Sequence, residues 1–413
     1  MADLLDAVVV GAGQAGLGMA YVLKEAGFDF LVYERGRIGE TWRTQRWDSF
    51  TLNTPNWMNV LPADVYDGPA PDGFYSRDQL VESFERYVRK FDLPVRQERR
   101  VTSVAPIPGE AAFLVTVRSP DEREEHVLAR NVIVASGCMQ QPKRPAIASH
   151  IPDDVMQLHA ADYRNPRELP SGAVVVVGSG QSGCQITEDL VAHGRKVYLC
   201  TSRVGRLPRR HRGRDILEWW ADMGYLDVRV EDVEDKAILR AAQPQVSGVG
   251  RYGHTVSLQQ LARDGVELLG RLRDVQDHSL DLAPDLIDNM RFADERAERF
   301  KREVDAFIER AGIVVPEDDD TSVPARDEKP AAPDRLDLNA HGVTSIIWCT
   351  GFTADFSWLR VPALDESGGP VHTGGASVVP RVYFIGFPWL RARKSGLVYG
   401  IHEDALHIAK AIN

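Results

Sequence analysis

Two runs of valine, each followed by a glycine-rich turn, stand out in the pattern of hydrophobic and polar positions. The valines at 8–10 precede the sequence GAGQAG at 11–16, and those at 174–177 precede GSGQSG at 178–183. An uninterrupted apolar run of this kind predicts a strand buried on both faces, as in a parallel sheet. Helix-forming sequence follows each turn. Both runs therefore predict the order strand, turn, helix.

The remaining apolar patterns extend these two units into an alternation of strands and helices, which is typical of an α/β fold. The helix behind each turn ends at a glycine, Gly27 in the first unit and Gly194 in the second, and another strand follows. The predicted strands and β-rich segments lie at 6–10, 28–33, 95–104, 112–118, 132–135, 196–200, 345–349 and 382–386. Further helices are predicted at 77–90, at 182–193, from Ser257, at 284–312 and after Gly400.

The spacing of the glycines predicts that both turns bind dinucleotides. The first glycine allows a tight turn, the second lets a pyrophosphate approach the backbone, and the third lets the helix pack on the strand. The phosphates then lie at a helix N-terminus, where free N–H groups favour anions. Two such turns predict two dinucleotides, a flavin and a nicotinamide. The residues assigned to them are Gly11, Gly13, Gln14, Ala15, Gly16, Gly178, Gly180, Gln181, Ser182 and Gly183.

The residues that follow the second strand of each unit indicate which dinucleotide binds there. Glu34 lies about 20 residues after the first turn, where a carboxylate can accept a hydrogen bond from a ribose 2′-OH, and Arg35 is assigned to the same site. A solvated charge at the strand end is the alternative for Glu34. The second unit has Ser202 and Arg203 in the matching place. Since a carboxylate repels a 2′-phosphate whereas arginine and hydroxyl groups bind one, the second site favours NADPH. The arginines at 206–214 are interpreted as a basic loop.

The order of the units predicts two Rossmann-type domains, the second inserted into the first. The first domain, expected at 1–150 and 336–413, is assigned to FAD, and the second, at 165–313, to NADPH. Residues 205–312 exceed what a Rossmann unit needs and predict a largely helical insertion. The sequence leaves open whether this insertion is a lid, a wall of the pocket or a dimer contact, and so leaves a homodimer open. Residues 314–335 are rich in proline and acid, which predicts a linker.

Composition removes several classes of function. Of the 413 residues, 43% are hydrophobic and 26% are charged, which is ordinary for a globular protein. The net charge of −11 argues against nucleic acid as a partner. No apolar run reaches the roughly 18 residues of a membrane span, and the N-terminus does not resemble a signal peptide. The four cysteines form neither a CxxC pair nor a metal-binding pattern, which predicts free thiols in the cytoplasm and no metal site.

These motifs together resemble the class B flavoprotein monooxygenases, and the nearest in pattern are the flavin-containing and YUCCA-like monooxygenases and their bacterial homologues. The segment at 39–42 resembles the family's flavin-lining loop, which implies that Trp42 contacts the flavin. Residues 134–137 are similar to the family's first Ala-Thr-Gly connection, and 348–352 to its late Ala-Thr-Gly-aromatic motif. The cofactor-binding residues implied by these two motifs are Ser136, Gly137, Thr350, Gly351 and Phe352.

One sequence fingerprint of this family matches the chain only in part. His159 and Tyr163 match its histidine and tyrosine, but Asp153 stands where the family has an aromatic residue and Val155 where it has glycine. The departure argues against the Baeyer–Villiger branch, in which the full fingerprint is expected. His159 is interpreted either as part of this fingerprint or as an ordinary histidine in a hinge.

The resemblance implies an enzyme that uses FAD, NADPH and O₂ on a small organic substrate. Reduced flavin would form a C4a-(hydro)peroxide that oxygenates the substrate, with nitrogen or sulfur as the favoured atom. The family has an asparagine before a proline that supports this oxygenated flavin. Asn53, before Thr54 and Pro55, matches it, and Asn56 is the reserve candidate.

Several alternatives stay open at this point. Within the family, Baeyer–Villiger oxygenation and oxidative decarboxylation of a 2-oxo acid are the other reactions. Outside it, the chain could be an NADPH oxidase or quinone-type flavin reductase, or a flavoprotein sensor without turnover. A disulfide reductase is disfavoured because it needs a redox-active cysteine pair, and the sequence has none.

Overall fold

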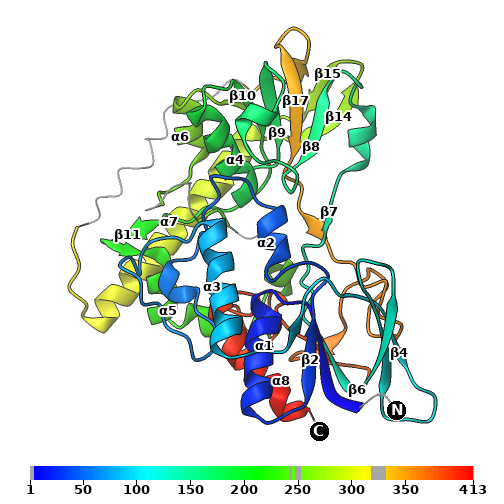
Figure 1. Cartoon of the computed structure of the whole chain (residues 1–413). Coiled ribbons are helices and arrows are strands. Elements are labelled where there is room, and N and C mark those ends of the chain that lie inside the picture. The colour runs from blue at the N-terminus through cyan, green and yellow to red at the C-terminus, as the bar shows by residue number, and fades with distance from the viewer. Residues whose placement is uncertain (1–3, 241–243, 247–252, 318–331, 413) are drawn as a thin grey trace.

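A sheet with a parallel centre forms the framework of the first domain, which lies in the lower half of Figure 1. The computed structural model describes residues 4–240, 244–246, 253–317 and 332–412. The strand order is β19-β20-β21-β6-β1-β2-β3. These strands are β1 (Leu4–Val10), β2 (Phe30–Tyr33), β3 (Val95–Arg96), β6 (Glu124–Val134), β19 (His372–Thr373), β20 (Ala376–Ser377) and β21 (Val382–Phe384). An antiparallel pair, β4 (Arg100–Pro106) and β5 (Phe113–Arg118), continues from β6.

A second sheet, separate from the first, lies in the upper half of Figure 1. All its strands are parallel, in the order β13-β10-β9-β17-β8. They are β8 (Met156–His159), β9 (Ala173–Val177), β10 (Val197–Cys200), β13 (Glu267–Leu269) and β17 (Val343–Trp348). The structure therefore confirms the α/β class, with one parallel sheet and one sheet whose central strands are parallel.

The structure contains the helices that the apolar patterns predict and, in addition, α2 and α5. Gly18 lets α1 and α8 pack closely, because a Cβ atom there would lie 2.4 Å from a side-chain methyl group of Ile401. Ser76 and Gln79 form a capping box at the start of α3. The long helix α7 ends at Gly312 in the left-handed conformation. The helices are α1 (Gln14–Glu25), α2 (Glu40–Thr44), α3 (Arg77–Lys90), α4 (Gln181–Ala192), α5 (Ile216–Asp222), α6 (Leu258–Arg263), α7 (Leu286–Ala311) and α8 (Ile401–Ala411).

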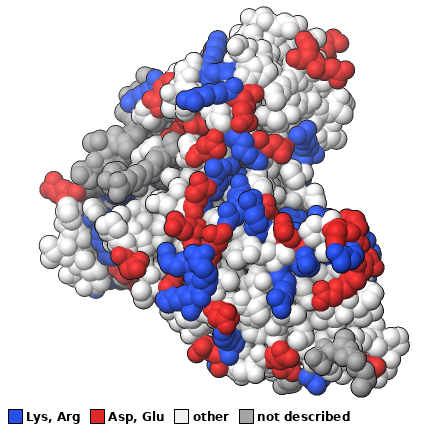
Figure 2. Space-filling model, in the orientation of Figure 1, with Lys and Arg blue, Asp and Glu red and all other residues white. Residues whose placement is uncertain are grey.

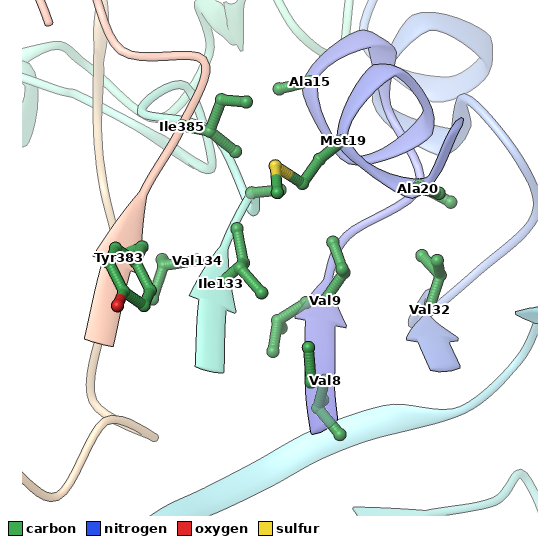
Figure 3. Close-up of a cluster of buried hydrophobic side chains, with 14 of the residues drawn as sticks. Val8, Val9, Ala15, Met19, Ala20, Val32, Ile133, Val134, Tyr383 and Ile385 are labelled. Carbon is green, nitrogen blue, oxygen red and sulfur yellow. The ribbon is translucent and has the colours of Figure 1, made fainter. Parts of the chain in front are cut away.

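The core of the first domain lies between the central strands and α1. Figure 3 shows Ala15 and Met19 of α1 on the same side of the strands as Ile385. The strand side chains in this view are fully or almost fully buried: Val8, Val9, Val32, Ile133, Val134 and Tyr383. Burial of these apolar side chains on both faces explains why the first valine run is continuous rather than alternating.

One domain boundary differs from the sequence-based expectation. Residues from 336 onward were expected in the first domain, but β17 pairs with β8 and β9 in the second sheet. In addition, β16 (Arg335–Asp337) joins β15 (Ser279–Leu282), which lies within the insertion. The reason is that an apolar strand pattern reports burial but does not identify the neighbouring strand.

The insertion at 205–312 contains α5, α6 and α7 together with strands. These are β11 (Arg210–His211), β12 (Arg214–Asp215), β13, β14 (Leu272–Gln276) and β15. Of the segment expected to be a linker, residues 318–331 lie outside the described residues. Among the helices that the structure describes, none is long and apolar enough to cross a membrane.

Candidate functional site

A cavity of about 390 Å³ opens at the carboxyl ends of the first-domain strands. Its lining comes from the segments that follow β1, β2, β6 and β21, which is where open α/β sheets bind ligands. Many of the predicted FAD-binding residues line it. They are Gly11, Gly13, Gln14, Ala15, Glu34, Arg35, Trp42, Ser136 and Gly137.

The first glycine turn has the geometry that a dinucleotide pyrophosphate requires. Gly11 has φ +111°, and a Cβ atom there would lie 2.7 Å from the carbonyl oxygen of Ala135. A Cβ atom on Gly16 would lie 1.8 Å from the carbonyl oxygen of Gly11, so the start of α1 packs directly on the turn. Gly13 lines the cavity and has no other group within 4 Å of its Cβ position. The first and third glycines thus serve packing, and the second faces the space for a ligand.

Glu34 is held rigidly at the cavity wall. Its Oε2 accepts a hydrogen bond from the Ala12 N–H at 2.8 Å, and its Oε1 accepts one from the Gly36 N–H at 3.0 Å. Burial raises the pKa of the Glu34 carboxyl, and these two hydrogen bonds oppose that rise. Each oxygen keeps a second lone pair, which suits hydroxyl groups of a ribose. The structure thus disfavours a merely solvated strand-end charge, since Glu34 is 8% exposed.

Trp42 and Arg46 line the cavity beside the glycine turn. The Trp42 Nε1–H donates to Gln14 Oε1 at 3.3 Å, and the Arg46 guanidinium lies 4.9 Å from the Trp42 ring centroid and 5.5 Å from that of Phe50. Arg46 is 9% exposed, and burial lowers its pKa to about 10, so it stays charged at neutral pH. Among the described residues, no carboxylate lies within ion-pair distance of it. A buried cation of this kind fits an anionic ligand.

The cavity lining predicts that Arg46→Met weakens FAD binding. Methionine keeps the apolar contacts with Trp42 and Phe50 but removes a charge-assisted hydrogen-bond donor, worth about 1.5–3 kcal/mol, or roughly 10- to 100-fold in affinity. Fluorescence titration of the apoprotein with FAD measures the loss. Arg43→Met is the control, because Arg43 pairs with Glu85 and does not line the cavity. Equal affinities for the two variants would show that Arg46 does not contact the cofactor.

The second glycine turn repeats the geometry of the first. A Cβ atom on Gly178 would lie 2.7 Å from the carbonyl oxygen of Cys349, one on Gly183 would lie 1.8 Å from the Gly178 oxygen, and Gly180 has open space. Residues 349–351 therefore stand beside the second turn as residues 135–137 stand beside the first. The structure places Thr350 and Gly351 at the end of β17 in the second sheet, and not at the first cavity.

Two of the predicted NADPH-binding residues lie beside this second turn. The Ser202 N–H donates to Ser179 Oγ at 3.0 Å, which holds the strand end against the turn. The exposed Arg203 guanidinium lies 4.4 Å from the ring centroid of Phe292 on α7. Gln181, also predicted to bind the nucleotide, accepts a hydrogen bond from the Val246 N–H through its side chain, at 2.9 Å.

His159 and Tyr163 connect segments of the second domain. The Ala161 N–H donates to His159 Nδ1 at 3.1 Å, so Nε2 carries the proton and donates to the Gly351 carbonyl at 3.0 Å. Burial lowers the pKa of His159, which favours this neutral form. The Phe352 ring lies edge-on to His159, at 4.9 Å between centroids. Tyr163 Oη donates to Asp189 at 2.6 Å. These bonds give His159 a structural role within the second domain, and both interpretations of it stay predictions.

The two candidate asparagines have different surroundings, and neither lines the cavity as defined above. Asn56 is 5% exposed and donates to the Ala70 carbonyl at 2.9 Å, so its amide holds its own loop together. Asn53 is half-buried, and its side-chain amide forms no hydrogen bond with any described residue. Of the two, Asn53 keeps its amide available for a ligand.

The interpretation of residues 206–214 as a basic loop is wrong for two arginines. Arg206 is 3% exposed and pairs with Asp294 at 2.6 Å, and Arg209 is 1% exposed and pairs with Asp215. Asp294 lies 88 residues away on α7, so the sequence carried no local signal for the Arg206 pair, whereas Asp215 lies six residues from Arg209. On the face of the molecule in Figure 2, basic and acidic side chains lie close together, without the continuous basic surface typical of nucleic-acid binding.

Comparisons with known proteins agree with this architecture. Residues 8–219 match the pyridine nucleotide-disulphide oxidoreductase family. An uncharacterized CzcO-like oxidoreductase of Geobacillus kaustophilus is 30% identical, over 100% of this chain and 99% of its own. The indole-3-pyruvate monooxygenase YUCCA1 of Oryza sativa subsp. japonica is 28% identical over 60% of each chain. The ornithine N-hydroxylase of Kutzneria sp. 744, solved with reduced FAD, NADP⁺ and L-ornithine, is 17% identical with a TM-score of 0.58, covering 99% of each chain.

Proposed function

Because this chain belongs to the pyridine nucleotide-disulphide oxidoreductase family, and within it to the class B flavoprotein monooxygenases, we propose that it is an NADPH-dependent monooxygenase that oxygenates nitrogen or sulfur in a small organic molecule. The observation that carries the proposal is the pair of equivalent glycine turns. Each has an open middle glycine, and each lies at the carboxyl end of a parallel strand. Such a pair suits an enzyme in which two dinucleotides meet.

The residues of the first cavity fit FAD. The turn at 11–16 would hold the pyrophosphate and Glu34 a ribose, while Trp42 and Arg46 would cover the cofactor beside the turn and exclude water. When bound, the flavin supplies the redox chemistry with NADPH and O₂ that the side chains of the protein cannot perform. The Asn53 side-chain amide would donate a hydrogen bond to the flavin. Because the amide is neutral, it does not titrate over the working pH range.

The choice of nitrogen or sulfur follows from the family resemblance and from neighbours in fold. The Kutzneria enzyme is named as a hydroxylase of an amine nitrogen, and this chain shares its fold. The YUCCA1 relative acts on a 2-oxo acid by its name, which makes oxidative decarboxylation the second candidate. The two reactions differ in product, so a substrate screen separates them.

The test is anaerobic reduction by NADPH, followed by rapid mixing with oxygenated buffer while the flavin spectrum is recorded. We expect a delayed return of the oxidised spectrum, and less H₂O₂ when an accepted amine, thioether or 2-oxo acid is present. Immediate return of oxidised flavin with one H₂O₂ per NADPH, unchanged by every compound, would instead identify an oxidase or reductase.

The basic residue beside the second turn predicts the choice of nicotinamide. Arg203→Ala is expected to raise the KM for NADPH by roughly 10- to 100-fold and to leave the KM for NADH nearly unchanged, because only NADPH carries the 2′-phosphate. Steady-state kinetics with both nucleotides measure the effect. Arg273→Ala, an exposed arginine on β14, serves as the control. If both KM values rise together, Arg203 does not recognise the 2′-phosphate.

A further inference from the structure

The loop that carries Asn53 is held by both domains. From the first domain, the Tyr75 carbonyl accepts a hydrogen bond from the Leu52 N–H at 2.9 Å. The Arg164 guanidinium donates to the Thr44 carbonyl, and the Asp48 N–H donates to the Arg164 carbonyl at 2.9 Å. Ser49 Oγ donates to the buried Asp189 of α4 at 2.8 Å. The geometry of this loop therefore depends on groups that belong to the NADPH-binding half of the chain.

Arg209 makes the contact nearest to the candidate asparagine. Its Nη1 donates to the Asn53 main-chain carbonyl at 2.8 Å, across 156 residues of sequence. Its Nη2 pairs with Asp215, which also accepts a hydrogen bond from the Leu217 N–H at 2.9 Å and so caps α5. The guanidinium lies 4.8 Å from the Phe74 ring centroid. One planar group thus joins the Asn53 loop, the start of α5 and the segment before α3.

The surroundings fix this guanidinium in one place. Arg209 is 1% exposed, and its own N–H donates to Thr255 Oγ1 at 2.9 Å. A guanidinium holds two acceptors in a rigid planar fork, whereas a lysine ammonium is a point charge on a flexible stem. Neither Arg209 nor Asp215 lines the cavity, so any effect of Arg209 on the flavin has to pass through the chain that it holds.

We propose that Arg209 is a positioning residue: from the second domain it fixes the main chain at Asn53, so that the Asn53 side-chain amide is presented to the flavin. The inference rests on the proposed function, in which Asn53 supports the oxygen chemistry. It also gives the insertion a role in the reaction, because both Arg209 and Asp215 belong to it. The orientation of the two domains and the position of Asn53 are thereby coupled.

The experiment compares the holoenzyme with its Arg209→Lys variant. Lysine keeps the charge beside Asp215 but cannot hold both acceptors in a planar fork. We expect FAD content and the rate of flavin reduction by NADPH to stay within about twofold, whereas the oxidised spectrum returns about tenfold sooner after mixing with oxygen. Hydrogen exchange of the backbone amides near Asn53, measured by mass spectrometry, should also rise. That readout is independent of turnover.

Arg206→Lys is the matched control. Arg206 lies in the same segment, is almost equally buried and is also paired with an aspartate, but it does not contact Asn53. It should lower thermal stability without shortening the return of the oxidised spectrum. An equal shortening in both lysine variants would overturn the inference, because the effect would then be a general loss of stability.

A double variant separates this inference from the function on which it rests. If Arg209 acts through Asn53, adding Arg209→Lys to Asn53→Ala changes the return time no further. A further acceleration of similar size overturns the inference. If Asn53→Ala shortens the return and Arg209→Lys does not, only the role of Arg209 fails. If Asn53→Ala has no effect, the proposed role of Asn53 fails as well.

Should Arg209→Lys not fold, Asp215→Asn is the second variant. It keeps the α5 cap and removes the charge that orients the fork, and it is likewise expected to shorten the return of the oxidised spectrum.

Discussion

Alanine at Gly13 is expected to remove FAD from the protein, whereas alanine at Gly180 is expected to leave FAD in place and to abolish efficient use of NADPH. Both glycines have backbone angles that alanine adopts freely, with φ of −84° and −73°. At neither position would a Cβ atom approach another protein group within 4 Å. The added methyl group therefore fills only the space where a pyrophosphate would lie. Overpacking of this kind costs about 1–3 kcal/mol, or roughly 5- to 150-fold in affinity.

The measurement is the FAD content of the purified variants, together with thermal stability and the rate of flavin reduction by NADPH. Gly16→Ala is the contrasting control. Its Cβ atom would lie 1.8 Å from the Gly11 carbonyl, so it should destabilise the fold and not only the complex. If Gly13→Ala and Gly180→Ala bind both cofactors normally, the open space at the middle glycines is not where pyrophosphates lie.

Asn53→Ala is expected to separate flavin reduction from oxygenation. The variant should load FAD and be reduced by NADPH as before, because the glycine turn, Glu34 and Arg46, which would hold the cofactor, are unchanged. It should then return to oxidised flavin about 100-fold faster after mixing with O₂ and release H₂O₂, since loss of one preorganised hydrogen-bond donor has effects of this size. Stopped-flow spectra and a peroxide assay measure both quantities.

Asn56→Ala provides the comparison for that experiment. The Asn56 amide is bonded to the Ala70 carbonyl, so its loss should lower the melting temperature and leave the return of oxidised flavin unchanged. Oxygenation that stays coupled in Asn53→Ala would refute the assignment of Asn53. A large acceleration in Asn56→Ala alone would transfer the role to Asn56.

The sequence by itself determined the two nucleotide-binding units. The valine runs, the glycine spacing and Glu34 are local features, because a strand, its turn and the following helix are contiguous in the chain. The predicted helices at 77–90 and 284–312 also lie close to the observed α3 and α7. Their ends are local features of the chain, the capping box at Ser76 and the left-handed Gly312.

Only the tertiary structure decided which distant segments meet. The strand pattern of β17 indicated that the strand is buried but not that it lies in the second sheet. The position of Thr350 beside the second turn follows from that placement. The arginines at 206–214 were interpreted from sequence as a basic loop, yet Arg206 and Arg209 are buried in ion pairs. The physical reason is that periodicity records how much water a residue meets, whereas the partner of a strand or a charge depends on the packing of segments far apart in the chain.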